Sequence, residues 1–329
     1  MSFARKDLLG LSGLSAGELT DLLDRADRLW DAAAGPGRLA SPPPGVGRLS
    51  VANLFLEPST RTRCSFELAE QRLGVEHLSI DGERLSLEKG ETLVDTGRVL
   101  AAMGVNVIVL RHPETGAPAV LAEALPHVHA VNAGDGANEH PTQALLDLLT
   151  LRRHWGEIAG RRVLMVGDVS HSRVVRSNYF GLTALGASVT LCGPPHLLPG
   201  SDVYPDATIT DDLDAALPEA DAVMALRIQR ERFSLGEAIP DPSAYRARYG
   251  ITSERVARLP DGVVILHPGP MNRDTEIDGA VADSLRALVL RQVTAGVAVR
   301  MAVLAAIAEA REAAGARGAD GTPRTDGPG

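Results

Sequence analysis

Residues 57–63 read Glu-Pro-Ser-Thr-Arg-Thr-Arg and carry the side chains that an anion site requires. They stand where an apolar run over 49–56 gives way to a helical pattern over 61–74. The first N–H groups of a helix have no partner inside it, and the helix dipole adds partial positive charge there. Hydroxyl and guanidinium groups at the same point add directed donors. This stretch therefore predicts a phosphate-binding site at a helix N-terminus.

Other polar segments also follow apolar runs, which is where ligands bind in open α/β sheets. Arg111-His112-Pro113 ends the run 105–111, and His140-Pro141-Thr142-Gln143 opens a helix. A neutral imidazole or an amide at that helix start could polarise a carbonyl oxygen. Considered singly, such segments are more often turns, helix caps or surface charges. The remaining ones are 86–92, 167–173, 227–232 and 267–270.

The pattern disfavours several other kinds of site. Residues 167–173 lack the G-x-G-x-x-G spacing of a nicotinamide site, and the sequence has neither a P-loop nor a metal-ligand cluster. Residues 13–17 match the hydrolase motif G-x-S-x-G, but no strand precedes them, and Ser15 with Glu18 predicts a helix capping box instead. A site rich in Arg, Lys, Thr and His fits group transfer between two anionic small molecules. We expect no metal and no cofactor.

The composition of the 329-residue chain disfavours several kinds of binding partner. A net charge of −9 disfavours a nucleic-acid or anionic-membrane surface, and 3% aromatic residues argue against base stacking. No apolar run is expected to reach the ~20 residues of a membrane span, and no leader pattern opens the chain. Cys64 and Cys192 are predicted to be reduced, buried thiols. We expect a cytoplasmic protein that binds neither nucleic acid nor membrane.

Apolar runs alternate with helical periods along most of the chain. This alternation predicts an α/β fold of two doubly wound domains, each a parallel sheet with helices on both faces, joined by interdomain helices. The first domain is expected over 1–150 and the second over 151–284. The apolar helix 285–314 is expected to complete the first domain, and 315–329 to form a disordered tail. The predicted strands are 49–56, 105–111, 128–133, 162–167, 187–192, 222–226 and 263–267, and the predicted helices are 14–34, 61–74, 92–103, 141–155, 172–185, 212–218 and 283–314.

Together these segments resemble the aspartate/ornithine carbamoyltransferase family. Its motifs appear in the family's order as Ser59-Thr60-Arg61-Thr62-Arg63, Ser86 to Asp95 (S-x-x-K-G-E-T-L-x-D), Arg111-His112-Pro113 and His140-Pro141-Thr142-Gln143. His267-Pro268-Gly269-Pro270 lacks the cysteine of the ornithine branch, and Arg227-Ile228-Gln229 replaces that branch's S-M-G loop. The resemblance therefore implies the aspartate branch. The implied reaction moves a carbamoyl group from carbamoyl phosphate to the α-amine of L-aspartate in pyrimidine biosynthesis.

The resemblance also implies a role for each matching residue. Those that would hold carbamoyl phosphate are Ser59, Thr60, Arg61, Thr62, Ser86, Arg111, His140, Gln143, Pro268 and Gly269. Those that would be catalytic are Arg61, Thr62, Lys89, Arg111 and His140, and those that would bind aspartate are Lys89, Arg173, Arg227 and Gln229. Glu57 and Arg232 would pair across the cleft when the domains close.

The implied assembly is a homotrimer with sites shared between subunits, because Ser86 and Lys89 would reach into a neighbour's site. A higher assembly with regulatory chains or dihydroorotase is left open by the sequence. Three alternative functions also stay open at this point. They are a carbamoyltransferase for ornithine or an acylated ornithine, an inactive structural member of a multienzyme assembly, and a nicotinamide-binding oxidoreductase.

Overall fold

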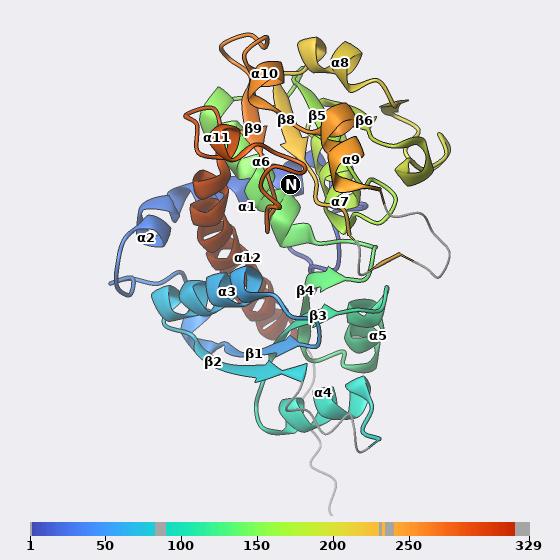
Figure 1. The fold of residues 1–329 in the computed structure, drawn as a ribbon. Helices are drawn as coiled ribbons and strands as arrows, with labels where there is room; N and C mark the ends of the chain where they lie inside the picture. Colours follow the sequence, from blue (N-terminus) through green and yellow to red (C-terminus); the bar gives the residue numbers. More distant parts are fainter. Residues whose placement is uncertain (1, 83–89, 230–231, 234–239, 320–329) are drawn as a thin grey trace, which may run out of the picture.

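The computed structural model describes residues 2–82, 90–229, 232–233 and 240–319. They form two parallel β-sheets, one in each half of the molecule, with helices on both faces of each sheet (Figure 1). The predicted α/β class with two doubly wound domains is thereby confirmed.

The first sheet has four strands in the order β2-β1-β3-β4. Val51 of β1 pairs with His77 on one side and with Val107 on the other, which places β1 and β3 at the centre. The strands are β1 (Ser50–Phe55), β2 (Glu76–Asp81), β3 (Val107–His112) and β4 (His129–Asp135). The connecting and following helices are α3 (Thr60–Leu73), α4 (Leu93–Ala102), α5 (Ala117–Ala124) and α6 (Pro141–Trp155).

The second sheet has five strands in the order β7-β6-β5-β8-β9, again all parallel. Its strands are β5 (Arg162–Val166), β6 (Ser188–Cys192), β7 (Ala207–Thr210), β8 (Ala222–Ala225) and β9 (Val264–Leu266). Its α-helices are α7 (Arg173–Ala184), α8 (Leu213–Ala216), α9 (Pro242–Tyr249), α10 (Ser253–Val256) and α11 (Gly279–Ala282). Short 3-10 turns occupy Val46–Arg48, Pro195–Leu197 and Leu217–Glu219.

Successive side chains of the central strands point to opposite faces of the sheet and so belong to different apolar cores. Val107 and Val109 of β3 belong to one core, whereas Ile108 and Leu110 belong to another on the opposite face. This alternation follows from the two-residue period of a strand that is buried on both faces. Strand β5 alternates in the same way, and one of its faces extends the first core into the second sheet. The two sheets therefore share one core, and each has a separate core on its other face.

The last helix, α12 (Val289–Ala319), begins near the second sheet and packs against helices of the first half (Figure 1). Its partners there include α1 (Ala16–Arg28), α2 (Trp30–Ala34), α3 and α6. The part Val289–Ala314 is long and apolar enough to cross a membrane by length and composition, so the expectation that no apolar run reaches that length was wrong. However, 78% of its most apolar window is buried inside the fold, as expected for a core helix.

Several expected elements differ from the observed ones. Strands β2 and β7 were not predicted, because polar and partly exposed residues interrupt their apolar pattern. The helix expected over 14–34 is divided at Leu29 into α1 and α2, although its capping box is confirmed, with Ser15 accepting the Glu18 N–H. Helix α12 begins at Val289 rather than 285 and continues to Ala319, so part of the expected tail is helical. Residues 320–329 of that tail lie outside the described residues.

The prediction of two buried thiols was correct for one cysteine only. Cys192 at the end of β6 is buried, but Cys64 is exposed. Cys64 lies on α3, and the buried side chains of that helix, which include Thr62, Ser65 and Phe66, face a different side from the thiol.

Candidate functional site

The candidate site lies where the strand order reverses in each sheet. In the first sheet the chain turns to opposite sides after β1 and β3, and in the second after β5 and β8. Loops at the carboxyl ends of such strands diverge and leave a crevice for a ligand. Glu57 to Thr62 follow β1, Arg111 is in β3, Arg173 follows β5, and Arg227 follows β8. The topology therefore brings four of the predicted segments to one place.

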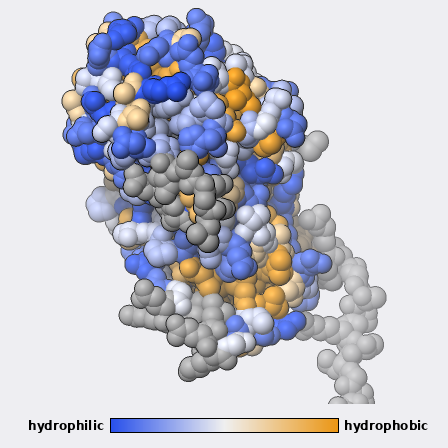
Figure 2. All heavy atoms as spheres, turned by 45° about the vertical axis from the view of Figure 1, so that its right-hand side comes forward, coloured by the Kyte–Doolittle hydropathy of each residue, from blue (hydrophilic) through white to orange (hydrophobic). Residues whose placement is uncertain are grey.

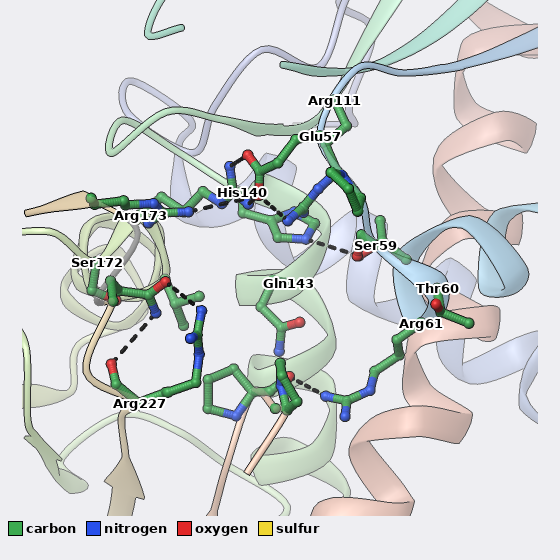
Figure 3. Close-up of a pocket in the computed structure, with 18 residues that line it drawn as sticks. Glu57, Ser59, Thr60, Arg61, Arg111, His140, Gln143, Ser172, Arg173 and Arg227 are labelled. Carbon is green, nitrogen blue, oxygen red and sulfur yellow. Dashed lines mark hydrogen bonds and ion pairs between the residues drawn. The ribbon is translucent and has the colours of Figure 1, made fainter. Parts of the chain in front are cut away.

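These residues line a cleft of about 550 Å³ (Figure 3). All predicted site residues within the described ranges contribute to its wall. They are Glu57, Ser59, Thr60, Arg61, Thr62, Arg111, His140, Gln143, Arg173, Arg227, Gln229, Arg232, Pro268 and Gly269. Ser86 and Lys89 lie outside the described residues.

The N-terminus of α3 forms one end of the cleft. Ser59 is the N-cap residue, but its side chain makes no capping hydrogen bond, and its hydroxyl donates to Thr62 Oγ1 at 3.0 Å. The first-turn N–H groups are thus left for another acceptor, as in other helix N-termini that bind anions. Arg61 extends from the same turn across the cleft and donates from Nη1 to the carbonyl oxygen of Pro268 (Figure 3).

Glu57 lies between guanidinium groups from both halves of the molecule. Arg173 donates to its two carboxylate oxygens at 2.6 and 2.9 Å, and Arg111 donates to Oε1 from the other side (Figure 3). Arg232 Nη2 is 4.0 Å from the same oxygen. Burial alone would raise the pKa of Glu57, but the Arg173 hydrogen bonds and the three positive charges together lower it. Glu57 therefore stays ionised and connects the two halves.

Arg111 is itself buried at the end of β3. It donates from Nη1 to the carbonyl oxygen of Ala133 at 3.2 Å, whereas its Nε has no partner among the described residues. Burial and the charge of Arg173 lower the pKa of Arg111 to about 9, so the guanidinium remains charged at neutral pH. A charged donor held in a desolvated wall interacts strongly with a developing negative charge.

His140 is the N-cap residue of α6 and is almost fully buried. Its Nε2 lies 3.5 Å from Thr62 Oγ1, and its Nδ1 has no partner among the described residues. Burial and the charges of Arg111 and Arg173 hold the pKa of His140 well below its usual value. The imidazole is therefore neutral at physiological pH and carries a single N–H.

The second half contributes a separate polar group. Arg227 Nη2 donates to Gln229 Oε1 at 3.2 Å, and the Gln229 backbone N–H donates to Asp168 Oδ2 at 3.1 Å. Asp168 is fully buried and its other oxygen lies 2.8 Å from His171 Nδ1. The carboxylate thus fixes the loop after β8 to the loop that leads into Arg173.

Some cleft residues were not assigned a role from the sequence. Pro58, Ser172, Val174 and Pro270 also line the cleft. Ser172 has a recognisable signal, because it is the N-cap residue of α7 and accepts the Val175 N–H at 3.3 Å. The supporting carboxylate of Asp168 had no such signal, since its partners come from other segments.

The arrangement suits chemistry on anions. Five arginines line the cleft, and Glu57 is the one carboxylate among its described lining residues. Within the described ranges, no three His, Cys, Asp or Glu side chains are grouped to hold a metal ion. Such a cleft can bind a phosphate at α3 and carboxylates near Arg173 and Arg227, with neutral His140 and Thr62 between them.

Comparison with known proteins agrees with this geometry. Two family models match the chain: aspartate/ornithine carbamoyltransferase, carbamoyl-P binding domain, over residues 6–153, and the Asp/Orn binding domain of the same family over 159–307. The aspartate carbamoyltransferase catalytic subunit of Gemmatimonas aurantiaca is 48% identical over 299 residues, 91% of this chain and 92% of that one.

This chain is similar to solved structures along nearly its whole length. The catalytic subunit of M. jannaschii aspartate transcarbamoylase has a TM-score of 0.78 at 34% identity, covering 93% of this chain and 98% of that one. Ornithine carbamoyltransferase from Thermus thermophilus has a TM-score of 0.79 at 26% identity, covering 93% and 99%. The fold is thus common to both branches, and sequence and site must distinguish them. From the family models and the relatives, the chain belongs to the aspartate/ornithine carbamoyltransferase family.

Proposed function

We propose that this chain catalyses the transfer of the carbamoyl group of carbamoyl phosphate to the α-amine of L-aspartate, in pyrimidine biosynthesis. The products are N-carbamoyl-L-aspartate and phosphate. The main support is the cleft itself, where guanidinium groups from both sheets surround one carboxylate, Glu57. The similar proteins named as aspartate enzymes support aspartate as the second substrate.

The phosphate would bind at the N-terminus of α3. Ser59, Thr60 and Arg61 would supply donors there, in addition to the first-turn N–H groups. Arg111 would bridge the phosphate and the carbamoyl oxygen, because it lies between α3 and the rest of the cleft. These contacts would place the carbamoyl carbon near Thr62 and His140.

The chemical step would depend on stabilisation of the tetrahedral oxyanion. Thr62, Arg111 and the neutral His140 would donate to the carbamoyl oxygen as negative charge develops on it. Gln143 and the carbonyl oxygens of Pro268 and Gly269 would orient the carbamoyl NH₂. The departing phosphate would accept the proton from the attacking amine, so that no covalent enzyme intermediate is required.

Aspartate would enter from the side of the second sheet. Its carboxylates would pair with Arg173, Arg227 and Gln229, whose guanidinium and amide groups face the cleft. Glu57 and Arg232 would hold the two halves together around both substrates. We also propose that residues 1–150, completed by the helix expected over 285–314, form the carbamoyl-phosphate domain, and that residues 151–284 form the aspartate domain.

We infer further that the active assembly is a homotrimer in which Ser86 and Lys89 complete a neighbour's site. Support comes from the exposed apolar side chains of the first half, which include Leu68, Leu78, Val99 and Met103. Apolar side chains also gather on the lower part of the surface in Figure 2. Surfaces of this kind often mark contacts between subunits. The free cysteines fit the reducing cytoplasm, where we place the protein.

The test is an assay of carbamoyl phosphate with aspartate and, separately, with ornithine. We expect N-carbamoyl-L-aspartate and no citrulline. Arg111→Ala should lower turnover by about 10²–10³, as loss of one oxyanion donor does. The matched control is Arg162→Ala, because Arg162 pairs with Glu219 and Asp221 outside the cleft and its loss should leave turnover unchanged. Full activity of Arg111→Ala would refute the assignment.

A further inference from the structure

Asp147 is a fully buried carboxylate immediately behind the cleft. It lies on α6, one turn after Gln143, and accepts three side-chain amide N–H groups from three helices. Gln143 Nε2 and Gln292 Nε2 of α12 donate to Oδ1 at 3.0 and 2.7 Å. Asn178 Nδ2 of α7 donates to Oδ2 at 2.8 Å. The Asp147 side chain thus connects α6, α7 and α12. One of its partners, Gln143, lines the cleft.

This contact determines how Gln143 can act. Asp147 Oδ1 accepts from both Gln143 Nε2 and Gln292 Nε2, so the NH₂ group of Gln143 is turned toward Asp147. The amide oxygen of Gln143 is then left for the cleft, into which the side chain extends between His140 and the Arg61 guanidinium (Figure 3). An amide oxygen in that place can accept a hydrogen bond from an N–H group but can offer nothing to a methyl group.

Through Gln292, the same carboxylate also helps to hold the opposite wall of the cleft, at His267. Gln292 gives its Nε2 to Asp147, so its Oε1 remains free to accept the His267 N–H at 3.0 Å. His267 directly precedes Pro268 and Gly269, whose carbonyl oxygens we assign to the carbamoyl NH₂. Asp147 therefore orients hydrogen-bond acceptors on both sides of the position proposed for the carbamoyl NH₂. One is the Gln143 amide oxygen, and the others are the carbonyl oxygens after His267.

Stability alone gives no reason for this carboxylate. Burial raises the pKa of Asp147 to about 7, which reflects the cost of holding its charge inside the protein. Replacing buried ionic groups by packed apolar residues is often neutral or stabilising. A carboxylate in this place is more readily explained by the directions that it imposes on its amide partners.

We propose that Asp147 is a positioning residue that makes the site selective for the amino group of the carbamoyl donor, by holding the Gln143 amide oxygen toward the cleft. The proposal rests on the function proposed above. It predicts selectivity between carbamoyl phosphate and acetyl phosphate, which has the same shape but carries a methyl group in place of the amine.

The experiment measures kcat/KM for carbamoyl phosphate and the inhibition constant of acetyl phosphate, with aspartate saturating. In Asp147→Ala we expect kcat/KM for carbamoyl phosphate to fall roughly tenfold, as for one lost hydrogen bond, while the inhibition constant of acetyl phosphate changes less than twofold. Asp147→Leu, which fills the site without a polar atom, should give the same result and serves if the alanine variant does not fold.

The rescue variant is Asp147→Asn. Its oxygen can replace Oδ1 as the acceptor for both glutamines. Its NH₂ can donate to Asn178 Oδ1 once the Asn178 amide turns over, because that oxygen has no hydrogen-bond partner among the described residues. We therefore expect Asp147→Asn to keep the wild-type selectivity. Equal losses for both phosphates, or unchanged selectivity in the alanine and leucine variants, would overturn the proposal. A wild-type protein that forms no N-carbamoyl-L-aspartate would instead overturn the proposed function, and the Asp147 proposal with it.

Discussion

Arg61, in the first turn of α3, donates a hydrogen bond to the carbonyl oxygen of Pro268, 207 residues further along the chain. The contact joins the start of α3, which follows β1, to the loop after β9, and so connects the two halves of the molecule. The guanidinium that we assign to phosphate and the carbonyl that we assign to the carbamoyl NH₂ are thus partners of one another. Carbamoyl phosphate has to compete with this contact in order to bind.

Gly269→Ala should disturb this contact directly. Gly269 has φ +64°, and a Cβ there would overlap the Arg61 guanidinium. Since the backbone conformation is also unfavourable for alanine, Arg61 and the 267–270 loop cannot both keep their places. We expect kcat/KM for carbamoyl phosphate to fall by about tenfold or more. Gly262→Ala is the control, because a Cβ there has no atom within 4 Å, and wild-type kinetics in Gly269→Ala would contradict this account.

Glu57→Gln should weaken the binding of aspartate. The substitution keeps the shape of the side chain but removes the charge that holds Arg173 and balances Arg111 and Arg232. Hydrogen bonds to charged groups contribute about 1.5–3 kcal/mol, so kcat/KM for aspartate should fall roughly 10- to 100-fold. Steady-state kinetics with varied aspartate measure this. The control is Glu219→Gln, which removes an exposed carboxylate that pairs with Arg162. It should leave kcat/KM for aspartate unchanged.

His140 should remain neutral throughout the physiological range. Burial and the nearby arginines lower its pKa well below 6.5, so the ring binds a proton only in acid. In a histidine-labelled sample, the ring ¹⁵N signals of His140, assigned with His140→Asn, should not shift between pH 6 and 8. A titration with its midpoint inside that range would show that the ring is partly protonated near neutral pH, contrary to the proposed role of a neutral donor.

Glu70 should make the protein less stable as the pH rises. This carboxyl of α3 is fully buried beside Asn53, and burial raises its pKa from 4.5 to about 7. Because the folded state holds the proton more tightly than the unfolded chain, stability is lost between about pH 4.5 and 7. The loss is at most about 3 kcal/mol.

Urea unfolding at pH 5, 6, 7 and 8 tests this expectation. Glu70→Gln cannot ionise, so its free energy of unfolding should rise relative to wild type as the pH increases. Glu219→Gln, at an exposed carboxylate of the second half that pairs with Arg162, should follow the wild-type profile. A constant difference between Glu70→Gln and wild type at all four pH values would disprove the linkage.

Particular residues show what the sequence could predict. Strands β1, β3 and β5 were evident because they are buried on both faces and read as nearly continuous apolar runs. Strand β2 was missed because it lies at the sheet edge, where polar side chains suffice. Arg61, Arg111 and His140 were found because each stands at the end of an apolar run or the start of a helix.

The supporting residues could not be found in this way. Asp147 stands inside an apolar helix, and nothing nearby in the sequence distinguishes it from a surface aspartate. Its partners Asn178 and Gln292 are 31 and 145 residues away. Their relation exists only in the folded chain, because contacts of such long range are set by tertiary packing rather than by local pattern.

The position of α12 has a consequence for how the protein is made. This helix covers α1, α3 and α6 of the first half, yet a ribosome synthesises it last among the described elements. About 150 residues separate the end of α6 at Trp155 from Ile307. At roughly 5–20 residues per second, the apolar faces of the first half wait about 8–30 s for their partner. Until then the nascent first half exposes an incomplete core, so its final folding must follow synthesis of the second half.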